Sequence, residues 1–205
     1  MYCILVTGIP AAGKSTMAAS LADQLKLPVI SKDSIKEILF DHVGFKSRQE
    51  KVNLGTAAME IMYYAAEQLM RAGKPFILEN NFENVSKEGL DSLLSSYGYS
   101  ALTVTLTGDY KVIYRRFLER NSSPDRHRGH VVNDCYPEKE VQGKEKVQAA
   151  SIRYEDYLYG IEHRGFDTFT ANREQIKVDV TDFSKVDMEL ILEKISKWCE
   201  KHADF

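Results

Sequence analysis

The chain has 205 residues, of which 43% are hydrophobic and 28% charged, and its formal net charge is −3 at pH 7. This length allows one substantial hydrophobic core and is short for two, and the composition excludes a disordered or membrane-spanning protein. The acidic balance gives no reason to expect extended nucleic acid as a partner. The apolar start is only four residues long and no apolar run approaches membrane-spanning length, so we expect a cytoplasmic protein without a membrane partner.

Predicted strands and helices alternate along the chain. Short apolar runs predict strands at residues 4–6, 28–30, 76–78, 101–106 and 176–180. Apolar residues at helical spacing predict helices at residues 14–25, 34–40, 53–71, 86–97, 109–119, 138–159 and 184–201. Ser34 with Glu37, and Ser184 with Asp187, are patterns that cap a helix, so we expect the second and the last helix to begin at these serines.

This alternation predicts a three-layer α/β fold. A central, mainly parallel five-stranded sheet would be covered by helices on both faces, with ligands at the carboxyl ends of its strands. No repeat and no low-complexity linker interrupts the chain. We therefore expect residues 1–205 to form a single domain.

Residues 8–16, between the first strand and the first helix, read Gly-Ile-Pro-Ala-Ala-Gly-Lys-Ser-Thr and match GxxxxGK[ST] at every fixed position. In this P-loop motif the backbone N–H groups surround the phosphates, Lys14 adds a positive charge, and the Ser15 hydroxyl ligates Mg²⁺. The predicted nucleotide-binding residues of the loop are Gly8, Ile9, Pro10, Ala11, Ala12, Gly13, Lys14, Ser15 and Thr16. A glycine-rich turn without a ligand is the alternative, but the predicted strand before the loop and helix after it favour binding of ATP with Mg²⁺.

The rest of the chain excludes several classes of nucleotide-binding protein. The Asn-Lys-x-Asp sequence that reads guanine in GTPases is absent. Motor and AAA-type ATPases need more residues than remain in this chain beyond those of the core. A small phosphotransferase is the class that remains.

Three stretches together resemble a known family: residues 8–16, residues 31–36 after the second strand, and residues 116–121 after the fourth. They look like the small P-loop kinases of the polynucleotide-kinase and zeta-toxin group, which includes chloramphenicol phosphotransferase. The resemblance implies an AAA-type P-loop kinase domain that transfers phosphate to a hydroxyl group. By position, it implies that Asp33 accepts the proton of that hydroxyl. Lys36 stands where the group often has Arg.

Two carboxylates follow neighbouring strands and are candidates for chemistry. Asp33 follows the second strand, where it would lie beside the γ-phosphate and orient an attacking alcohol, although it could instead cap the second helix. Glu79 ends the third strand, where it could hold Mg²⁺ through water, although a solvated strand end is the alternative. The predicted metal site therefore consists of Ser15 and Glu79.

Five arginines lie within fourteen positions of this acidic chain, namely Arg115, Arg116, Arg120, Arg126 and Arg128. The density resembles that of a kinase lid, which we expect near residues 115–133. Arg116 and Arg120 would bind the nucleotide, and Arg120 and Arg126 are the favoured catalytic arginines together with Lys14 and Asp33. A solvated basic face is the alternative.

The sequence thus predicts an ATP-dependent kinase that phosphorylates a hydroxyl of a small-molecule or nucleotide-like acceptor. A polynucleotide 5′-hydroxyl kinase and a toxin that phosphorylates a nucleotide sugar are alternatives within the enzymes. A regulatory module that binds ATP without transferring phosphate is the alternative outside them. The acceptor cannot be named from sequence, because specificity depends on the shape of the pocket.

Overall fold

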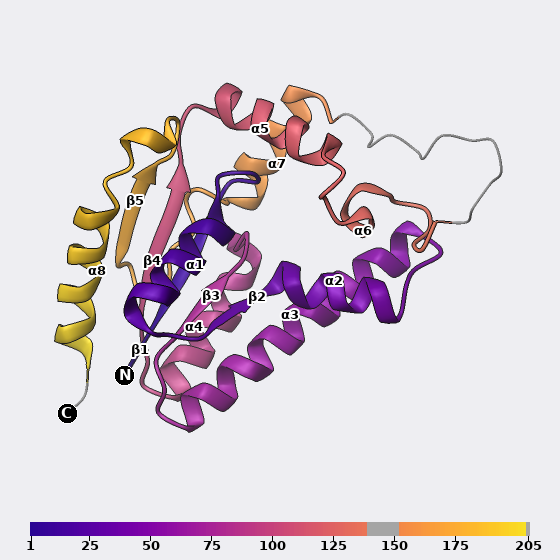
Figure 1. The fold of residues 1–205 in the computed structure, drawn as a ribbon. Coiled ribbons are helices and arrows are strands. Elements are labelled where there is room, and N and C mark those ends of the chain that lie inside the picture. Colours follow the sequence, from indigo (N-terminus) through magenta and orange to yellow (C-terminus); the bar gives the residue numbers. More distant parts are fainter. Residues whose placement is uncertain (139–151, 204–205) are drawn as a thin grey trace.

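The computed structural model describes residues 1–138 and 152–203. Within these residues, five parallel strands form one sheet in the order β2-β3-β1-β4-β5 (Figure 1). The strands are β1 (Tyr2–Gly8), β2 (Val29–Ser31), β3 (Phe76–Glu79), β4 (Ser100–Thr107) and β5 (Gln175–Asp179). The predicted α/β fold with a central five-stranded sheet is confirmed, and every pair of neighbouring strands is parallel.

Helices connect the strands and cover the sheet. They are α1 (Lys14–Leu25), α2 (Lys32–His42), α3 (Arg48–Arg71), α4 (Lys87–Ser96), α5 (Tyr110–Ser122), α6 (Arg128–Val131), α7 (Tyr154–Arg164) and α8 (Met188–His202). Two short 3₁₀ turns, η1 (Asn84–Ser86) and η2 (Phe183–Lys185), precede α4 and α8. Among the helices that the structure describes, none has the length and apolar character needed to cross a membrane.

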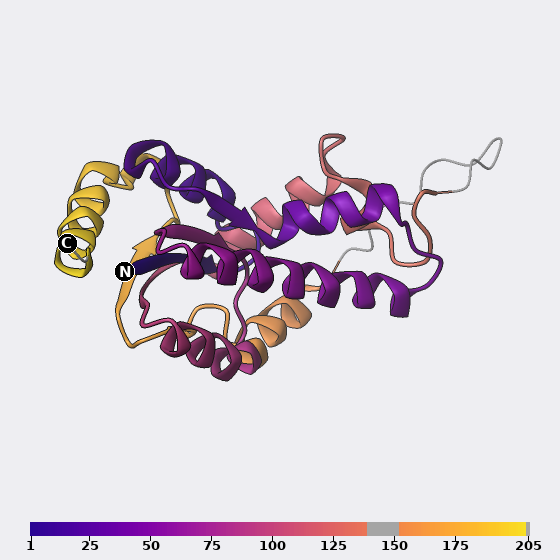
Figure 2. The same ribbon diagram turned by 90° about the horizontal axis from the view of Figure 1, so that it is seen from below.

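The central strand β1 supplies side chains to two hydrophobic cores, because successive residues of a strand point to opposite faces. Ile4 and Val6 pack with apolar residues of α1, α5, α7 and α8. Cys3 and Leu5 pack with apolar residues of α3 and α4 on the other face. The sheet is therefore the middle of three layers, as both views of the ribbon show (Figures 1 and 2).

Helices α2 and α3 form a hairpin that projects from the sheet, and α6 lies against its far end (Figures 1 and 2). Phe40 and Phe45 of the hairpin pack with Val132, which follows α6, in a third and smaller hydrophobic cluster. A single antiparallel bridge joins Phe45 to Tyr136. The segment after α6 is thereby attached to the hairpin, which is distant from it in the sequence.

Helix α2 begins two residues before the predicted start at Ser34, so that prediction was wrong. Ser31, the last residue of β2, is the N-cap, and its hydroxyl oxygen accepts a hydrogen bond from the backbone N–H of Ser34 at 3.4 Å. The strand thus leads into the helix without an intervening loop, and Asp33 lies in the first turn of the helix.

Helix α8 begins at Met188 rather than at Ser184, which is a second correction. The side chain of Asp187 caps α8 by accepting from the N–H of Leu190 at 2.9 Å. Ser184 belongs instead to η2, where its hydroxyl donates to the carboxylate of Asp182 at 2.7 Å. The hydrogen bond to Asp182 holds Ser184 in this separate turn and not in α8.

The predicted helix at residues 138–159 falls partly outside the described residues, because residues 139–151 are not among them. Of the described part, Glu138, Ile152 and Arg153 are not helical, and the helix begins at Tyr154 and extends to Arg164. The predicted bounds were wrong there. The end at Gly165, whose φ of +70° is left-handed, is a typical helix stop.

The start of α3 also differs from the prediction of residue 53. The helix begins at Arg48, and the Ser47 hydroxyl caps it by accepting from the N–H of Glu50 at 3.2 Å.

Candidate active site

The loop between β1 and α1 has a backbone that suits the approach of an anion. Gly8 has φ +130°, and a Cβ there would lie 2.1 Å from the carbonyl oxygen of Leu106 on β4, so only glycine fits. Gly13, with φ +85°, is the N-cap of α1, and no side chain caps this end of the helix. The N–H groups of the first turn of α1 are therefore free of side-chain acceptors, as in an anion-binding helix start.

Lys14 folds back over this loop. Its ammonium donates a hydrogen bond to the carbonyl oxygen of Ile9 at 3.0 Å, and the residue is only 7% exposed. Burial lowers its pKa to about 8, although the negative charges of Glu79 and Asp33 partly oppose the shift. A buried, partly compensated ammonium at this place would be stabilised by an anion on the loop.

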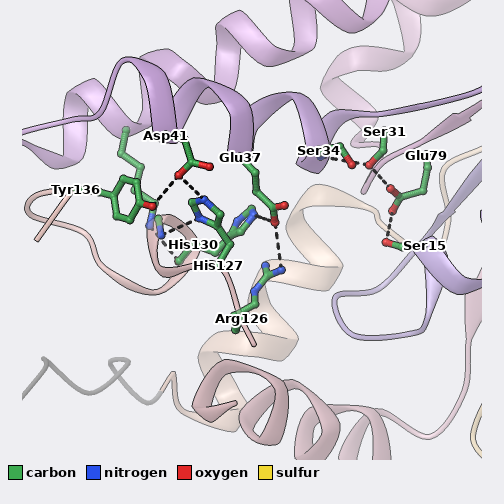
Figure 3. Close-up of polar contacts among 12 residues, drawn as sticks. Ser15, Ser31, Ser34, Glu37, Asp41, Glu79, Arg126, His127, His130 and Tyr136 are labelled. Atoms are coloured by element: carbon green, nitrogen blue, oxygen red, sulfur yellow. Dashed lines mark hydrogen bonds and ion pairs between the residues drawn. The ribbon is translucent and has the colours of Figure 1, made fainter. Parts of the chain in front are cut away.

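Glu79, the last residue of β3, accepts hydrogen bonds from two serine hydroxyls (Figure 3). The hydroxyl of Ser15 donates to Oε1 at 3.4 Å, and the hydroxyl of Ser31 donates to Oε2 at 2.5 Å. Glu79 is 4% exposed, and burial raises the pKa of its carboxyl group, against the lowering effect of the Ser31 hydrogen bond.

This group of oxygen atoms fits a hard divalent cation. The Ser15 hydroxyl and the buried Glu79 carboxylate are the ligand types that Mg²⁺ uses beside a phosphate. Ser15 lies on the first turn of α1 and contacts Glu79 at the end of β3, and their role as a metal site stays a prediction. Ser31 was not predicted; the only sequence signal was its position at the end of a strand that neighbours β3.

Asp33 is close to the loop and makes no hydrogen bond or ion pair with another described residue. Burial would raise the pKa of its carboxyl group, but its coupling to the His130 ring and the positive charges of Lys36, Arg126 and Lys14 outweigh burial and lower the pKa. Because Ser31 caps α2, Asp33 is not needed as the cap. A half-buried, ionised carboxylate with free lone pairs is available for a hydroxyl group.

The five arginines of the predicted lid separate into different environments. Arg115 is exposed. Arg128 forms a two-pronged contact with the carboxylate of Glu138 at 2.7 and 2.6 Å.

Arg116 lies against the segment that follows β5. Its guanidinium donates to the carbonyl oxygens of Val180 and Thr181, at 2.6 Å each, and lies 4.2 Å above the centre of the Phe183 ring. These contacts engage the guanidinium with the segment after β5, which the sequence did not indicate.

Arg120 and Arg126 are the arginines whose charges act on Lys14 of the phosphate loop. The Nε atom of each is buried without a hydrogen-bond partner among the described residues. Burial and the charge of Arg126 lower the pKa of Arg120. Arg126 lies 3.9 Å from the carboxylate of Glu37 on α2, as Figure 3 shows. Buried donors without partners are rare, and an anionic ligand would supply the missing acceptors.

Residues 123–138, which we name the roof segment, are held by the α2–α3 hairpin. The ammonium of Lys51 on α3, a residue only 4% exposed, donates to the carbonyl oxygens of His130 and Val132 at 3.0 and 2.5 Å and to Asn133 Oδ1 at 3.2 Å. At the tip of the hairpin, the Asp41 carboxylate contacts Tyr136 and His127 at 2.7 and 3.0 Å (Figure 3).

The predicted lid at residues 115–133 therefore contains two kinds of structure. Its first part belongs to α5, whose Phe117 packs in the core with Tyr157 of α7. Its second part is the roof segment, which is attached to the hairpin and not to the sheet.

A cavity of about 350 Å³ lies beside the loop. Its walls include Gly13, Thr16, Met17, Leu106, Val180 and Phe183. The apolar lining next to the loop suits a flat, apolar group attached to the phosphates. Tyr157, which the sequence did not single out for this role, supports the loop by donating to the carbonyl oxygen of Pro10 at 2.9 Å.

Comparison with known proteins agrees with this geometry. Residues 3–134 match the model of a protein family described as AAA domain. No curated protein matches the chain. A presumed kinase from Chloroflexus aurantiacus j-10-fl has a similar structure, with a TM-score of 0.74 and 23% identity over 98% of this chain and 97% of that one.

Two further solved structures share the architecture. A gluconokinase from Sinorhizobium meliloti 1021 is 15% identical over 99% of this chain and 98% of its own, with a TM-score of 0.56. A shikimate kinase from Bacteroides thetaiotaomicron is 16% identical over 97% and 98%, with a TM-score of 0.54. These likenesses show the P-loop NTPase fold. The narrower resemblance to the polynucleotide-kinase and zeta-toxin group stays a prediction.

Proposed function

Because this chain belongs to the AAA domain family, we propose that it is an ATP-dependent kinase that transfers the γ-phosphate of ATP to a hydroxyl group of a small-molecule or nucleotide-like acceptor. The observation that carries the proposal is the ionised Asp33 carboxylate, which lies beside Lys14 and Arg126 and has no partner of its own among the described residues. A protein that only sensed ATP would not need a base at this place. We further propose that residues 1–205 act as one kinase domain, with the roof segment as its lid.

The nucleotide would bind along the loop and the adjoining cavity. The N–H groups of residues 8–16 and the Lys14 ammonium would contact the β- and γ-phosphates. The base would enter the cavity beside Gly13 and Phe183, where Arg116 also lies. Arg116 would thus act at the base end of the nucleotide rather than on its phosphates.

Mg²⁺ would be held by the Ser15 hydroxyl and, through water, by Glu79. When bound, the ion would offset the negative charge of the phosphates during transfer. The hydrogen bond from Ser31 keeps the Glu79 carboxylate directed at Ser15.

The transfer itself would depend on Asp33 and the two buried arginines. Asp33 accepts the proton of the acceptor hydroxyl while the oxygen of that hydroxyl forms a bond to the γ-phosphorus. The bond from that phosphorus to the β-phosphate oxygen breaks, and ADP leaves. Arg120 and Arg126 donate to the phosphoryl oxygens, where charge is concentrated during transfer.

The test is phosphate transfer to an unfractionated pool of metabolites. The protein is incubated with ATP, Mg²⁺ and a deproteinised small-molecule extract of cells, and ADP formation is compared with that in the absence of extract. The Lys14→Ala variant is the blank. We expect extract-dependent ADP and a phosphorylated product only with the parent protein. ADP formation that does not depend on extract would contradict the kinase function and favour an ATPase or a sensor.

A further inference from the structure

The roof segment places two histidines against α2, and the ring nitrogens of the two are engaged differently (Figure 3). In His127, Nδ1 accepts a hydrogen bond from the backbone N–H of Gly129 at 3.0 Å, and Nε2 contacts the Asp41 carboxylate at 3.0 Å. In His130, Nε2 lies 2.8 Å from the Glu37 carboxylate. The other ring nitrogen of His130, Nδ1, has no hydrogen-bond partner among the described residues.

The ring of His130 is held in place by α2 and α3. Its side chain is only 9% exposed, and the Phe40 ring of α2 meets it edge-on, with ring centres 5.6 Å apart. The backbone carbonyl of His130 accepts from the Lys51 ammonium of α3 at 3.0 Å. Because an ionised carboxylate only accepts hydrogen bonds, Glu37 keeps the proton of the neutral ring on Nε2, so Nδ1 holds a free lone pair. A histidine oriented by a carboxylate in this way is suited to take up a proton.

Asp33 lies on the same face of α2 as Glu37. It precedes Glu37 by four residues, and side chains at this spacing are neighbours on a helix surface. Arg126 of the roof segment lies 3.9 Å from the Glu37 oxygen that His130 contacts, and its charge also acts on Asp33. Among the charged groups that act on Asp33, His130 has the largest effect. An ionised carboxylate and a bare ring nitrogen thus share one small region, and neither has a proton to donate to the other.

The surroundings of His130 keep its ring neutral in the absence of a ligand. Burial lowers the pKa of His130, and the charges of Arg126 and Lys36 add to that effect, although Asp33 opposes it. A phosphate beside Arg126 would offset one of these positive charges and raise the pKa of His130, so ATP would make Nδ1 a better proton acceptor. The ionisable groups that surround the residue come from α2 (Asp33, Lys36 and Glu37), α3 (Lys51) and the roof segment (Arg126 and His127).

We propose that His130 is a positioning residue for Asp33 and takes over the proton that Asp33 removes from the acceptor hydroxyl. This inference rests on the proposed kinase function. The O–H bond of the acceptor breaks as its oxygen bonds to the γ-phosphorus, and the proton passes through Asp33 to Nδ1 of His130. ADP leaves with the electron pair of the broken P–O bond. The imidazolium is stabilised by the carboxylates of Asp33 and Glu37, and it returns its proton to water after the products dissociate.

The proposal gives the roof segment a part in the chemistry. His130 reaches the face of α2 that carries Asp33 only because this segment is attached to the hairpin, through the contacts of Lys51 and of Glu37. The proton acceptor is therefore complete only while the roof segment lies on α2.

His130→Gln separates proton transfer from a structural role. The glutamine amide keeps an N–H that can donate to Glu37, but it cannot take up a proton. We expect kcat for the extract-dependent transfer to fall roughly 10²-fold, the lower end of the contribution of a general base, because Asp33 remains. The Kd for ATP and the Tm should be unchanged. The exposed His163→Gln on α7 is the control.

The two ways in which this experiment can fail are distinguishable. A parent protein that transfers phosphate alongside an equally active His130→Gln variant would overturn the proton transfer to His130 and leave the kinase function intact. A parent protein without extract-dependent transfer would contradict the kinase function itself.

Added imidazole tests the proton transfer directly. His130→Ala leaves space beside Glu37, and free imidazole should restore part of the lost transfer, at a rate that follows the concentration of neutral imidazole as the pH is varied. The matched control is His127→Ala in the same segment. Both ring nitrogens of His127 serve contacts of the roof segment, so imidazole should not restore any transfer lost there. Rescue of both alanine variants, or of neither, would overturn the proposal.

Discussion

The Ser15 hydroxyl at the start of α1 donates a hydrogen bond to the Glu79 carboxylate at the end of β3, at 3.4 Å and across 64 positions of the chain. The contact brings together the two oxygen ligands of the proposed Mg²⁺ site. It forms because β1 and β3 are paired in parallel, with Val6 opposite Glu79, so the loop after β1 and the end of β3 lie at the same edge of the sheet.

We expect Glu79→Gln to increase the Mg²⁺ concentration required for transfer by about 10- to 100-fold, the usual effect of changing a group that supports a metal. The amide keeps the shape and removes the charge. The exposed Glu60→Gln on α3 is the control. Initial rates as a function of Mg²⁺ measure the effect, and an unchanged requirement would assign Glu79 to structure alone.

The raised pKa of Glu79 leads us to expect that Mg²⁺ binding depends on pH. Burial raises the pKa of Glu79, whereas nearby cations lower that of Asp33. As the pH falls, Glu79 should therefore be protonated before Asp33, and the apparent Mg²⁺ affinity should decline at a higher pH than for an ordinary glutamate. In a plot of transfer rate against pH, we expect the acidic limb to move to lower pH when the Mg²⁺ concentration is raised. A limb that does not respond to Mg²⁺ would contradict this assignment.

Lys14 should take up a proton when the nucleotide binds. Its pKa is about 8 without ligand because of burial, and the negative phosphates would raise it. Calorimetry at about pH 8.5 in buffers of different ionisation enthalpy should reveal the uptake, and Lys14→Arg, which stays charged, should abolish it. Binding of ATP without proton uptake would place the phosphates away from Lys14. Lys14→Ala should lose transfer altogether.

Arg120→Ala and Arg126→Ala should lower kcat more than they weaken ATP binding. The two guanidinium groups have buried Nε atoms without partners, and they act on charge that is concentrated during transfer. The exposed Arg115→Ala is the matched control and should be neutral. Equal loss of kcat and of ATP affinity would instead indicate that these arginines only bind the ground state.

Asp33→Asn should bind ATP within a few-fold of the parent and lose transfer by roughly 10²–10⁴-fold, which is the contribution of a positioned base. A role in helix stability would behave differently. An acidic residue in the first turn contributes about 0.3–1 kcal/mol to the helix, so its loss would lower the free energy of unfolding slightly and leave kcat intact. Full transfer activity in Asp33→Asn would eliminate the base role.

Lys51→Met should release the roof segment from the hairpin. The change leaves the acceptors on His130, Val132 and Asn133 without their donor, so we expect a loss of about 2–3 kcal/mol in the free energy of unfolding. Proteolysis of the segment 121–130 should become faster, and kcat should fall because Arg126 lies in the same segment. ATP affinity should change little.

Two further variants test the prediction for Lys51, one as a weaker change and one as a control. Asn133→Ala removes one of the three acceptors and should show the same effects more weakly. The exposed Lys46→Met, next to the hairpin turn, is the control. If Lys51→Met is destabilised but its kcat is unchanged, the roof segment does not act as a lid.

The fold and the phosphate loop could be predicted from the sequence because their signals are local. The loop motif needs eight consecutive residues, and the strands and helices around it show their periodicity in short windows. Asp33 and Glu79 could be selected for the same reason, since each follows a strand of a parallel sheet, and ligands bind at that edge.

Where the sequence offered two local solutions, only the tertiary structure decided between them. Ser31 and Ser34 can each cap a helix, and Ser31 caps α2 because β2 extends to it and pairs it with Glu79 in the register of the sheet. The five arginines look equivalent in sequence, yet Arg116 is held by carbonyls after β5, while the Nε atoms of Arg120 and Arg126 are buried without hydrogen-bond partners among the described residues. Lys51 gave no sequence signal at all, because its three acceptors lie about 80 positions away. Spacing along the chain determines which residues share a face of a helix or strand, whereas the partner of a buried charge depends on which distant backbone the fold brings within hydrogen-bonding distance.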